Sequence, residues 1–184
     1  MPRAILAGLI LVLATGVTLW IGEGLNLEVE SVTLLGVATG AIVALVPDQT
    51  LSRRLAAFLL GFIAGFVGYL FRAAVTPDTA TGRALAAALI VLLCVGVFAI
   101  AAGRLPLWSA LLGAASLAGA YEFTYAQAPT RVLDTSVSSA TALLLCVAVG
   151  FIVVALTSAP RPPAAAETSA EDPTPIDQMM ETSK

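Results

Sequence analysis

The chain has 184 residues, of which 59% are hydrophobic and 11% are charged, and its net charge is −3. A soluble domain is about 45–50% apolar and about 25% charged, so this apolar surface exceeds what one small soluble core can bury. The weak net charge and the lack of a basic cluster argue against nucleic acid as a partner, and the absence of histidine excludes histidine-based catalysis and histidine-ligated metals.

Apolar runs divide the chain into six segments, and a membrane crossing takes about 20 apolar residues. The predicted spans are 4–21, 32–46, 55–71, 84–102, 107–121 and 137–156. We therefore predict an all-α fold, a polytopic transmembrane helical bundle that occupies residues 1–157. The loops between the spans are predicted at 22–31, 48–54, 73–82, 103–106 and 122–136.

The first two spans differ in how clearly they are delimited. Residues 4–21 have a second interpretation as a secretory signal peptide, with Ala14-Thr15-Gly16 as a poor cleavage site. The apolar run continues beyond that site to Ile21, which favours a retained helix. The second span is short and stops at Pro47, which cannot continue a helix comfortably.

The later spans are separated by clearer turn signals. Gly103-Arg104-Leu105-Pro106 predicts a tight turn, with Pro106 suited to the first position of the next helix. The fourth and fifth spans should therefore form an antiparallel hairpin. After the sixth span the composition changes completely, and residues 158–184 are predicted to be a disordered acidic tail.

The end of this tail carries a helix-start signal, in which Thr174 is followed by a proline and, three residues on, by an acid. Ile176, Met179 and Met180 would then lie on one face of a short helix. Such a face can dock into a groove on a partner protein. The alternative is a featureless solubilising tail, because short apolar triplets arise often by chance.

Basic residues predict the orientation of the bundle, because cytoplasmic loops carry an excess of Lys and Arg. With a cytoplasmic N-terminus, five arginines lie inside and three lie outside. The inner set is Arg3, Arg53, Arg54, Arg104 and Arg161, and the outer set is Arg72, Arg83 and Arg131. We therefore expect both termini to be cytoplasmic, in a protein of the plasma (cytoplasmic) membrane.

The two halves of the chain share an order of features, which suggests a 3+3 repeat. Each half has a plain apolar span, a span rich in small residues, a loop with an acid and a third span; the acid-containing loop segments are 46–50 and 132–136. Three spans per half would invert one half relative to the other, as in channels and transporters. The alternative is a chance likeness, because the matching residues are few and common.

Small residues recur at short steps in the second and third spans and predict smooth helix faces for close packing. They are Gly36, Gly40, Ala44, Gly61, Gly65 and Gly68. We expect these faces to pack against helices of the same chain or of another copy. The alternative is a pore lined by backbone.

Ionisable groups are absent from the middle of every span, although charges inside spans are the usual markers of transport sites. Glu122 and Arg72 come closest. We expect Glu122 to be a solvated carboxylate at the membrane surface, and the alternative is a pair with Arg72 or Arg131. Cys94 and Cys146 lie mid-span and are expected to be small packing residues.

These features predict a membrane protein without catalytic chemistry, cofactor or metal, because no acid, base, nucleophile or metal-ligand cluster lies within the spans. Its partners would be the lipid bilayer and either further copies of itself or other membrane proteins. The leading functional hypothesis is helix packing with such partners. The alternative is a passive channel or permease for a small uncharged solute, which needs only hydroxyls and carbonyls along its path.

Overall fold

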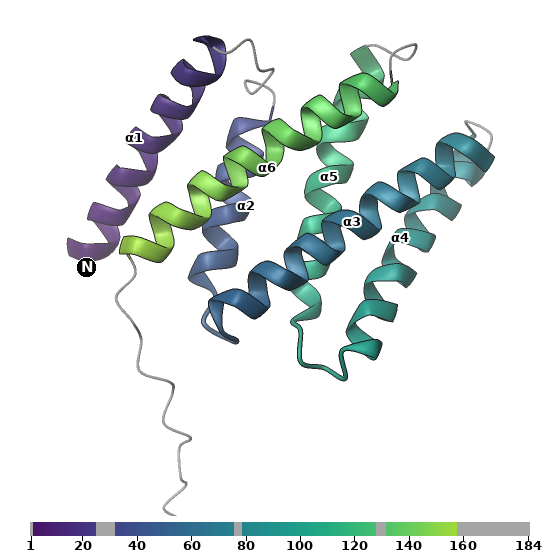
Figure 1. The fold of residues 1–184 in the computed structure, drawn as a ribbon, viewed down its shortest axis with the longest axis horizontal. Helices are drawn as coiled ribbons and strands as arrows, with labels where there is room; N and C mark the ends of the chain where they lie inside the picture. Colours follow the sequence, from purple (N-terminus) through teal and green to yellow (C-terminus); the bar gives the residue numbers. More distant parts are fainter. Residues whose placement is uncertain (1, 25–31, 76–78, 128–131, 158–184) are drawn as a thin grey trace, which may run out of the picture.

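The computed structural model describes residues 2–24, 32–75, 79–127 and 132–157, and these residues form helices and short connections with no strand among them. The helices are α1 (Pro2–Gly24), α2 (Thr33–Leu45), α3 (Leu51–Val75), α4 (Ala80–Ile100), α5 (Leu107–Gln127) and α6 (Val132–Thr157) (Figure 1). The prediction of an all-α fold is therefore confirmed for the described residues.

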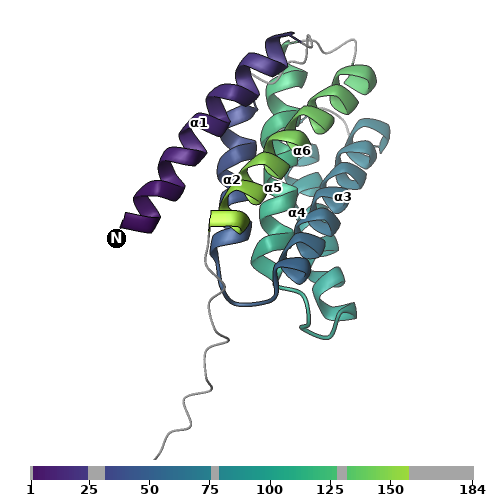
Figure 2. The same cartoon turned by 60° about the vertical axis from the view of Figure 1, so that its left-hand side comes forward.

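Consecutive helices run antiparallel, and two pairs of helices cross closely (Figures 1 and 2). α6 packs across α2, α3 packs across α5, and α1 and α4 lie at opposite edges. We call the end with the turns at 46–50 and 101–106 the lower end, as in Figure 1. The upper end holds the C-terminal ends of α1, α3 and α5.

The helix ends follow from local chemistry. Thr79 caps α4, because its side-chain hydroxyl accepts a hydrogen bond from the Gly82 backbone N–H at 3.2 Å. After α4 the chain turns through Ala102 and Gly103, whose φ angles are 50° and 71°, a region that suits glycine. α2 ends two residues before Pro47, which lacks the N–H needed to extend a helix.

Three of the predicted loops are largely helical in their described residues, and these predictions are wrong. In the predicted loop 48–54, α3 already begins at Leu51, so Arg53 and Arg54 are helical. In the predicted loop 73–82, α3 continues to Val75 and α4 begins at Ala80. In the predicted loop 122–136, α5 continues to Gln127 and α6 begins at Val132. Hydropathy marks where the apolar run stops, whereas helical hydrogen bonding continues through polar residues at a helix end.

Within the described part of the chain, three helical segments are long and apolar enough to cross a membrane: Leu51–Val75, Ala80–Ile100 and Val137–Thr157. The prediction of six such spans is therefore confirmed for three. Gly8–Gly24 and Thr33–Leu45 are apolar but shorter. At 1.5 Å per residue the 13 residues of α2 extend about 20 Å, less than the roughly 30 Å thickness of a hydrocarbon core.

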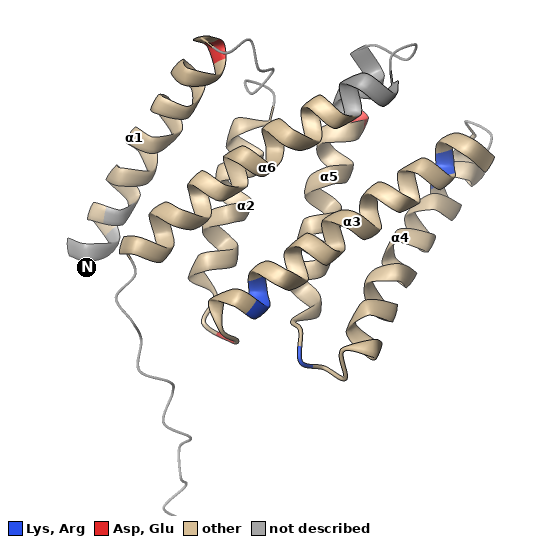
Figure 3. Cartoon of the chain, in the orientation of Figure 1, with Lys and Arg blue, Asp and Glu red and all other residues tan. Residues whose placement is uncertain are grey.

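The charged and apolar side chains are distributed as in a protein that contacts lipid. Among the described residues, charges lie at the helix ends and in turns, and the middle of the bundle has none (Figure 3). Large apolar side chains such as Leu13, Leu34, Leu92 and Leu145 are exposed along the outer faces of four helices. Exposed apolar surface of this extent indicates a membrane environment.

Candidate functional site

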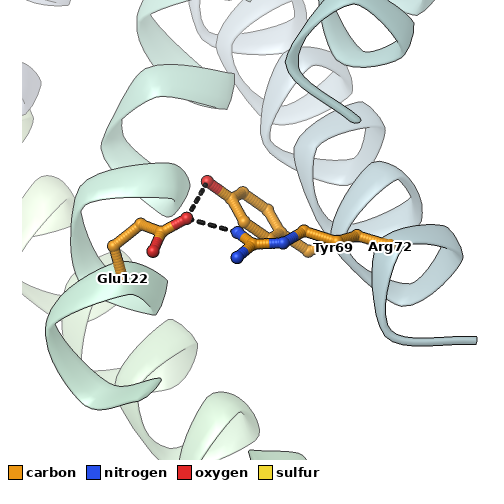
Figure 4. A network of polar contacts seen from close by, with 3 residues as sticks. All are labelled: Tyr69, Arg72 and Glu122. Atoms are coloured by element: carbon orange, nitrogen blue, oxygen red, sulfur yellow. Dashed lines mark hydrogen bonds and ion pairs between the residues drawn. The ribbon is translucent and has the colours of Figure 1, made fainter. Parts of the chain in front are cut away.

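A cluster of polar side chains joins α3 to α5 near the upper end, and we call Tyr69, Arg72 and Glu122 the upper cluster (Figure 4). Arg72 Nη1 donates to Glu122 Oε1 at 2.5 Å, and the Tyr69 hydroxyl donates to the same oxygen at 3.3 Å. The Tyr121 ring lies 4.2 Å from the Tyr69 ring, centroid to centroid. The Arg72 guanidinium carbon lies 5.8 Å from the centre of the Tyr69 ring, within cation–π range.

The upper cluster corrects the sequence-based preference for a solvated Glu122. Its side chain is 47% exposed, but it pairs with Arg72, whose side chain is only 10% exposed. A buried guanidinium needs a counter-charge or hydrogen-bond acceptors, so the pairing offsets the cost of burying Arg72. Because both donors share one carboxylate oxygen, the cluster acts chemically as a cross-link between two helices.

A second group of polar contacts lies at the lower end. Arg54 of α3 donates from Nη1 to the carbonyl oxygens of Val43 and Ala44, each at 2.9 Å. Ser109 of α5 donates from its hydroxyl to the backbone carbonyl of Arg54 at 2.7 Å. These three bonds tie the beginnings of α3 and α5 to the end of α2.

Trp108 adds a further contact at this end, because its indole N–H donates to the Asp48 carboxylate. This bond joins the beginning of α5 to the turn between α2 and α3. The polar contacts at the lower end therefore involve three helices and one turn.

Arg54 makes interhelical contacts that sequence reasoning missed. It is only 6% exposed, and its Nε is buried without a hydrogen-bond partner in the described part of the chain. Its guanidinium lies against the C-terminal carbonyls of α2, where the helix dipole places partial negative charge. The sequence signal was an Arg-Arg pair at 53–54 directly after a proline-containing turn, but hydropathy assigned both residues to a cytoplasmic loop.

The small residues of α2 lie against α6. A Cβ added at Gly40 would overlap the Val147 carbonyl oxygen, and one added at Gly36 would overlap the Cys146 Cβ. Ala44 is buried in a cluster that includes α6. These positions therefore face a neighbouring helix of the same chain.

The glycines of α3 have two different neighbours. A Cβ at Gly61 would overlap the Ala110 backbone of α5, whereas one at Gly65 would lie 3.2 Å from the Ala114 Cα. Gly68 faces α4 instead. Of these three glycines, Gly61 therefore lies nearest to the backbone of a facing helix.

Two further glycines make equally close contacts and were missed from the sequence. A Cβ at Gly113 would overlap the Phe58 carbonyl oxygen, and one at Gly150 would overlap the Val37 carbonyl oxygen. Each is an isolated glycine in an apolar run. The signal that locates both is a four-residue spacing of small residues: Ser109 and Gly113; Ala142, Cys146 and Gly150.

Both cysteines are completely buried at helix contacts. Cys94 lies within hydrogen-bonding distance of the Ala110 carbonyl oxygen, at 3.9 Å from its sulfur, and Cys146 lies 3.8 Å from the Thr33 hydroxyl. We expect both thiols to resist a membrane-impermeant maleimide in the folded protein and to react after denaturation. Rapid labelling of either one before denaturation would contradict the packing described here.

Several sequence-based candidates lie outside the described residues. These are Arg131, the alternative partner of Glu122, and the proposed docking residues Ile176, Met179 and Met180. The predicted tail, residues 158–184, also lies outside them.

Comparisons with family models, with curated proteins and with solved structures give no match for this chain.

Proposed function

We propose that the chain crosses the plasma membrane six times, with both termini cytoplasmic, as a 3+3 inverted repeat that conducts a small uncharged solute passively. In this proposal α1, α2 and α5 join the three longer apolar segments as spans. The antiparallel order of the helices and the charges at their ends support it. The short α2 is accommodated by local thinning of the bilayer or by its burial among longer helices.

The single observation that carries this proposal is a symmetry in the helix contacts. Exchanging α1 with α4, α2 with α5 and α3 with α6 converts each packed helix pair into another packed pair. The α2/α6 contact corresponds to α5/α3, α1/α6 to α4/α3, α1/α2 to α4/α5, and α2/α3 to α5/α6. The α2/α5 contact corresponds to itself, as expected for helices beside a two-fold axis.

The closest contacts follow the same exchange residue by residue. Gly40 lies against the Val147 carbonyl in one crossing pair, and Gly113 lies against the Phe58 carbonyl in the other. Gly113 stands 73 positions after Gly40, and Val147 stands 89 positions after Phe58. A shift of 73 therefore relates α2 to α5, and a shift of 89 relates α3 to α6.

The contacts made by glycines of α6 and α3 show the same two sequence shifts. Gly150 lies against the Val37 carbonyl, and Gly61 lies against the Ala110 backbone. Ala110 stands 73 positions after Val37, and Gly150 stands 89 positions after Gly61. Four close contacts with two constant shifts support an internal repeat more strongly than the shared order of spans does.

The repeat favours a conduit over helix packing with partners, which is the leading hypothesis from the sequence alone. Inverted repeats in membrane proteins place a pathway at the repeat interface. The predicted packing glycines of α2 and α3 meet helices of the same chain, so they are not free to bind a partner. Charges confined to the helix ends of the described residues fit a solute without charge.

A swelling assay on proteoliposomes tests the conduit. We expect vesicles with the protein to swell faster than protein-free vesicles in glycerol or urea, and equally fast in potassium glutamate. Vesicles with the same amount of an unrelated polytopic protein control for leakiness. Swelling that matches the protein-free vesicles in every small neutral solute tried would contradict the proposal.

Partner packing remains a second candidate because the two edge helices carry open glycines. Gly8 and Gly16 of α1 and Gly96 of α4 have no neighbouring atom within 4 Å of an added Cβ. Copurification from native membranes tests this candidate. Replacing Gly16 and Gly96 by leucine should remove a specific partner if these edges bind one, and should leave the swelling rate unchanged.

The topology is tested with single cysteines at exposed helix ends. We expect Glu23→Cys and Thr79→Cys to react with an impermeant maleimide from outside the cell, and Thr50→Cys and Arg104→Cys to react only from inside, because the excess of arginine lies on that side. Labelling of position 23 and position 104 from the same side would contradict the antiparallel six-span arrangement.

A further inference from the structure

We infer that the chain is built as two rigid three-helix bundles, α1–α2–α6 and α3–α4–α5, that hinge against each other. Their interface, here called the seam, consists of the contacts of α5 with α6 and of α2 with α3 and α5, and Arg54 links the two bundles across it. Each bundle takes two helices from one sequence half and the third helix from the other half. The inference rests on the proposed function only in what the hinge would control, namely access to the conduit.

The packing separates the two bundles. α2 and α6 make the most extensive contact in the chain, followed by α3 and α5, and both contacts lie inside a bundle. α1 packs on α6 and α2, and α4 packs on α3 and α5. Contacts between the bundles are those of α5 with α6 and the smaller ones of α2 with α3 and with α5.

Among the described residues, two of the three buried cores each lie within one bundle. One core lies entirely within the α1–α2–α6 bundle and consists of Ala41, Ala44 and Val154 with Leu11 and Phe151 packed against it. Another lies entirely within the α3–α4–α5 bundle and consists of Ala64, Tyr69, Ile90, Cys94, Ala110 and Ala114. The third and largest core joins the two bundles, with Phe58, Phe62 and Leu117 on one side and Val37, Leu143 and Val147 on the other.

The polar contacts also sort by bundle. The upper cluster lies wholly within the α3–α4–α5 bundle, so it stiffens that bundle. Ser109 holds the Arg54 backbone within the same bundle. The Arg54 guanidinium, by contrast, reaches the other bundle, where it binds the Val43 and Ala44 carbonyls.

Arg54 therefore links the two bundles at the lower end of the seam, and we call its contact with the Val43 and Ala44 carbonyls the clasp. Its backbone belongs to one bundle, and its charged head binds the helix end of the other. A buried cation is held in place only by the acceptors it finds, and Nε has none among the described residues. One donor of the guanidinium therefore lacks an acceptor within the described part of the chain.

Pairs of spin labels in the full-length protein test the hinge, in a background with Cys94→Ala and Cys146→Ala. Labels at Ile100 and Leu156 report across the seam, because both are exposed near the lower end of different bundles. Labels at Ile5 and Leu156 lie within the α1–α2–α6 bundle and serve as the matched control.

We expect Arg54→Met to shift the Ile100–Leu156 distances to longer values and to leave the Ile5–Leu156 distances unchanged. Arg54→Lys should give a smaller shift, because one ammonium can still donate to the helix end, and it carries the test if Arg54→Met does not fold. Unchanged cross-seam distances in both variants would overturn the clasp. Equal broadening in both label pairs would overturn the rigid bundles. The spin-label distances do not depend on transport. If the distances shift as expected but the vesicles do not swell, the conduit is refuted and the hinge is not.

Discussion

Gly40→Leu and Gly61→Leu are expected to be the most destabilising single substitutions among the positions considered, each costing about 3 kcal/mol or more. At both sites even a Cβ would overlap backbone atoms of the facing helix. Backbone atoms cannot move aside as a flexible side chain can, so the two helices must separate. Unfolding in mixed detergent micelles, followed by tryptophan fluorescence, measures the free-energy change.

Other glycines provide matched controls for this prediction. Gly65→Leu should cost less than Gly61→Leu, because an added Cβ at position 65 lies 3.2 Å from the nearest atom. Gly96→Ala has open space and should be neutral or slightly stabilising, since alanine is the better helix former. Equal stability of Gly40→Leu, Gly61→Leu and Gly96→Ala would show that the crossing contacts are not close.

The helices were largely predictable because each contains a long apolar run bounded by proline, glycine or charge. Their ends were not, because hydropathy treats a charged residue as loop even where the helix continues. Arg54 illustrates the consequence. Its acceptors, the Val43 and Ala44 carbonyls, precede it by only 11 and 10 residues, respectively. Their closeness depends on the turn at 46–50, whose geometry is not encoded in hydropathy.

The glycine contacts were predictable in part, for a different reason. A four-residue stripe shows that a helix has a smooth face, but it does not say which helix packs on that face. Gly36 and Gly40 form such a stripe, and their neighbours in α6 lie more than 100 positions later. The partner becomes predictable only when matching stripes are compared across helices, as in the equivalence of Gly40 with Gly113.

Glu122→Ala is expected to be more destabilising than Arg72→Met, although each removes one member of the same ion pair. Arg72 is buried, so loss of the carboxylate removes an acceptor from a guanidinium that water reaches poorly. We expect a cost of about 1–3 kcal/mol for Glu122→Ala. Glu122 is half-exposed, so water can solvate it in Arg72→Met, and that change should cost about 1 kcal/mol or less.

The remaining variants separate charge from hydrogen bonding in this cluster. Glu122→Gln keeps an acceptor for Tyr69 and Arg72 but removes the charge, so its cost should lie between zero and that of Glu122→Ala. Glu23→Ala, at an exposed helix end, serves as the control and should change stability by less than about 0.5 kcal/mol. The free energy of unfolding of all four variants and of the double variant Arg72→Met/Glu122→Ala gives the coupling energy directly. A coupling near zero would mean that the two side chains act independently and that the ion pair does not hold α3 and α5 together at this end.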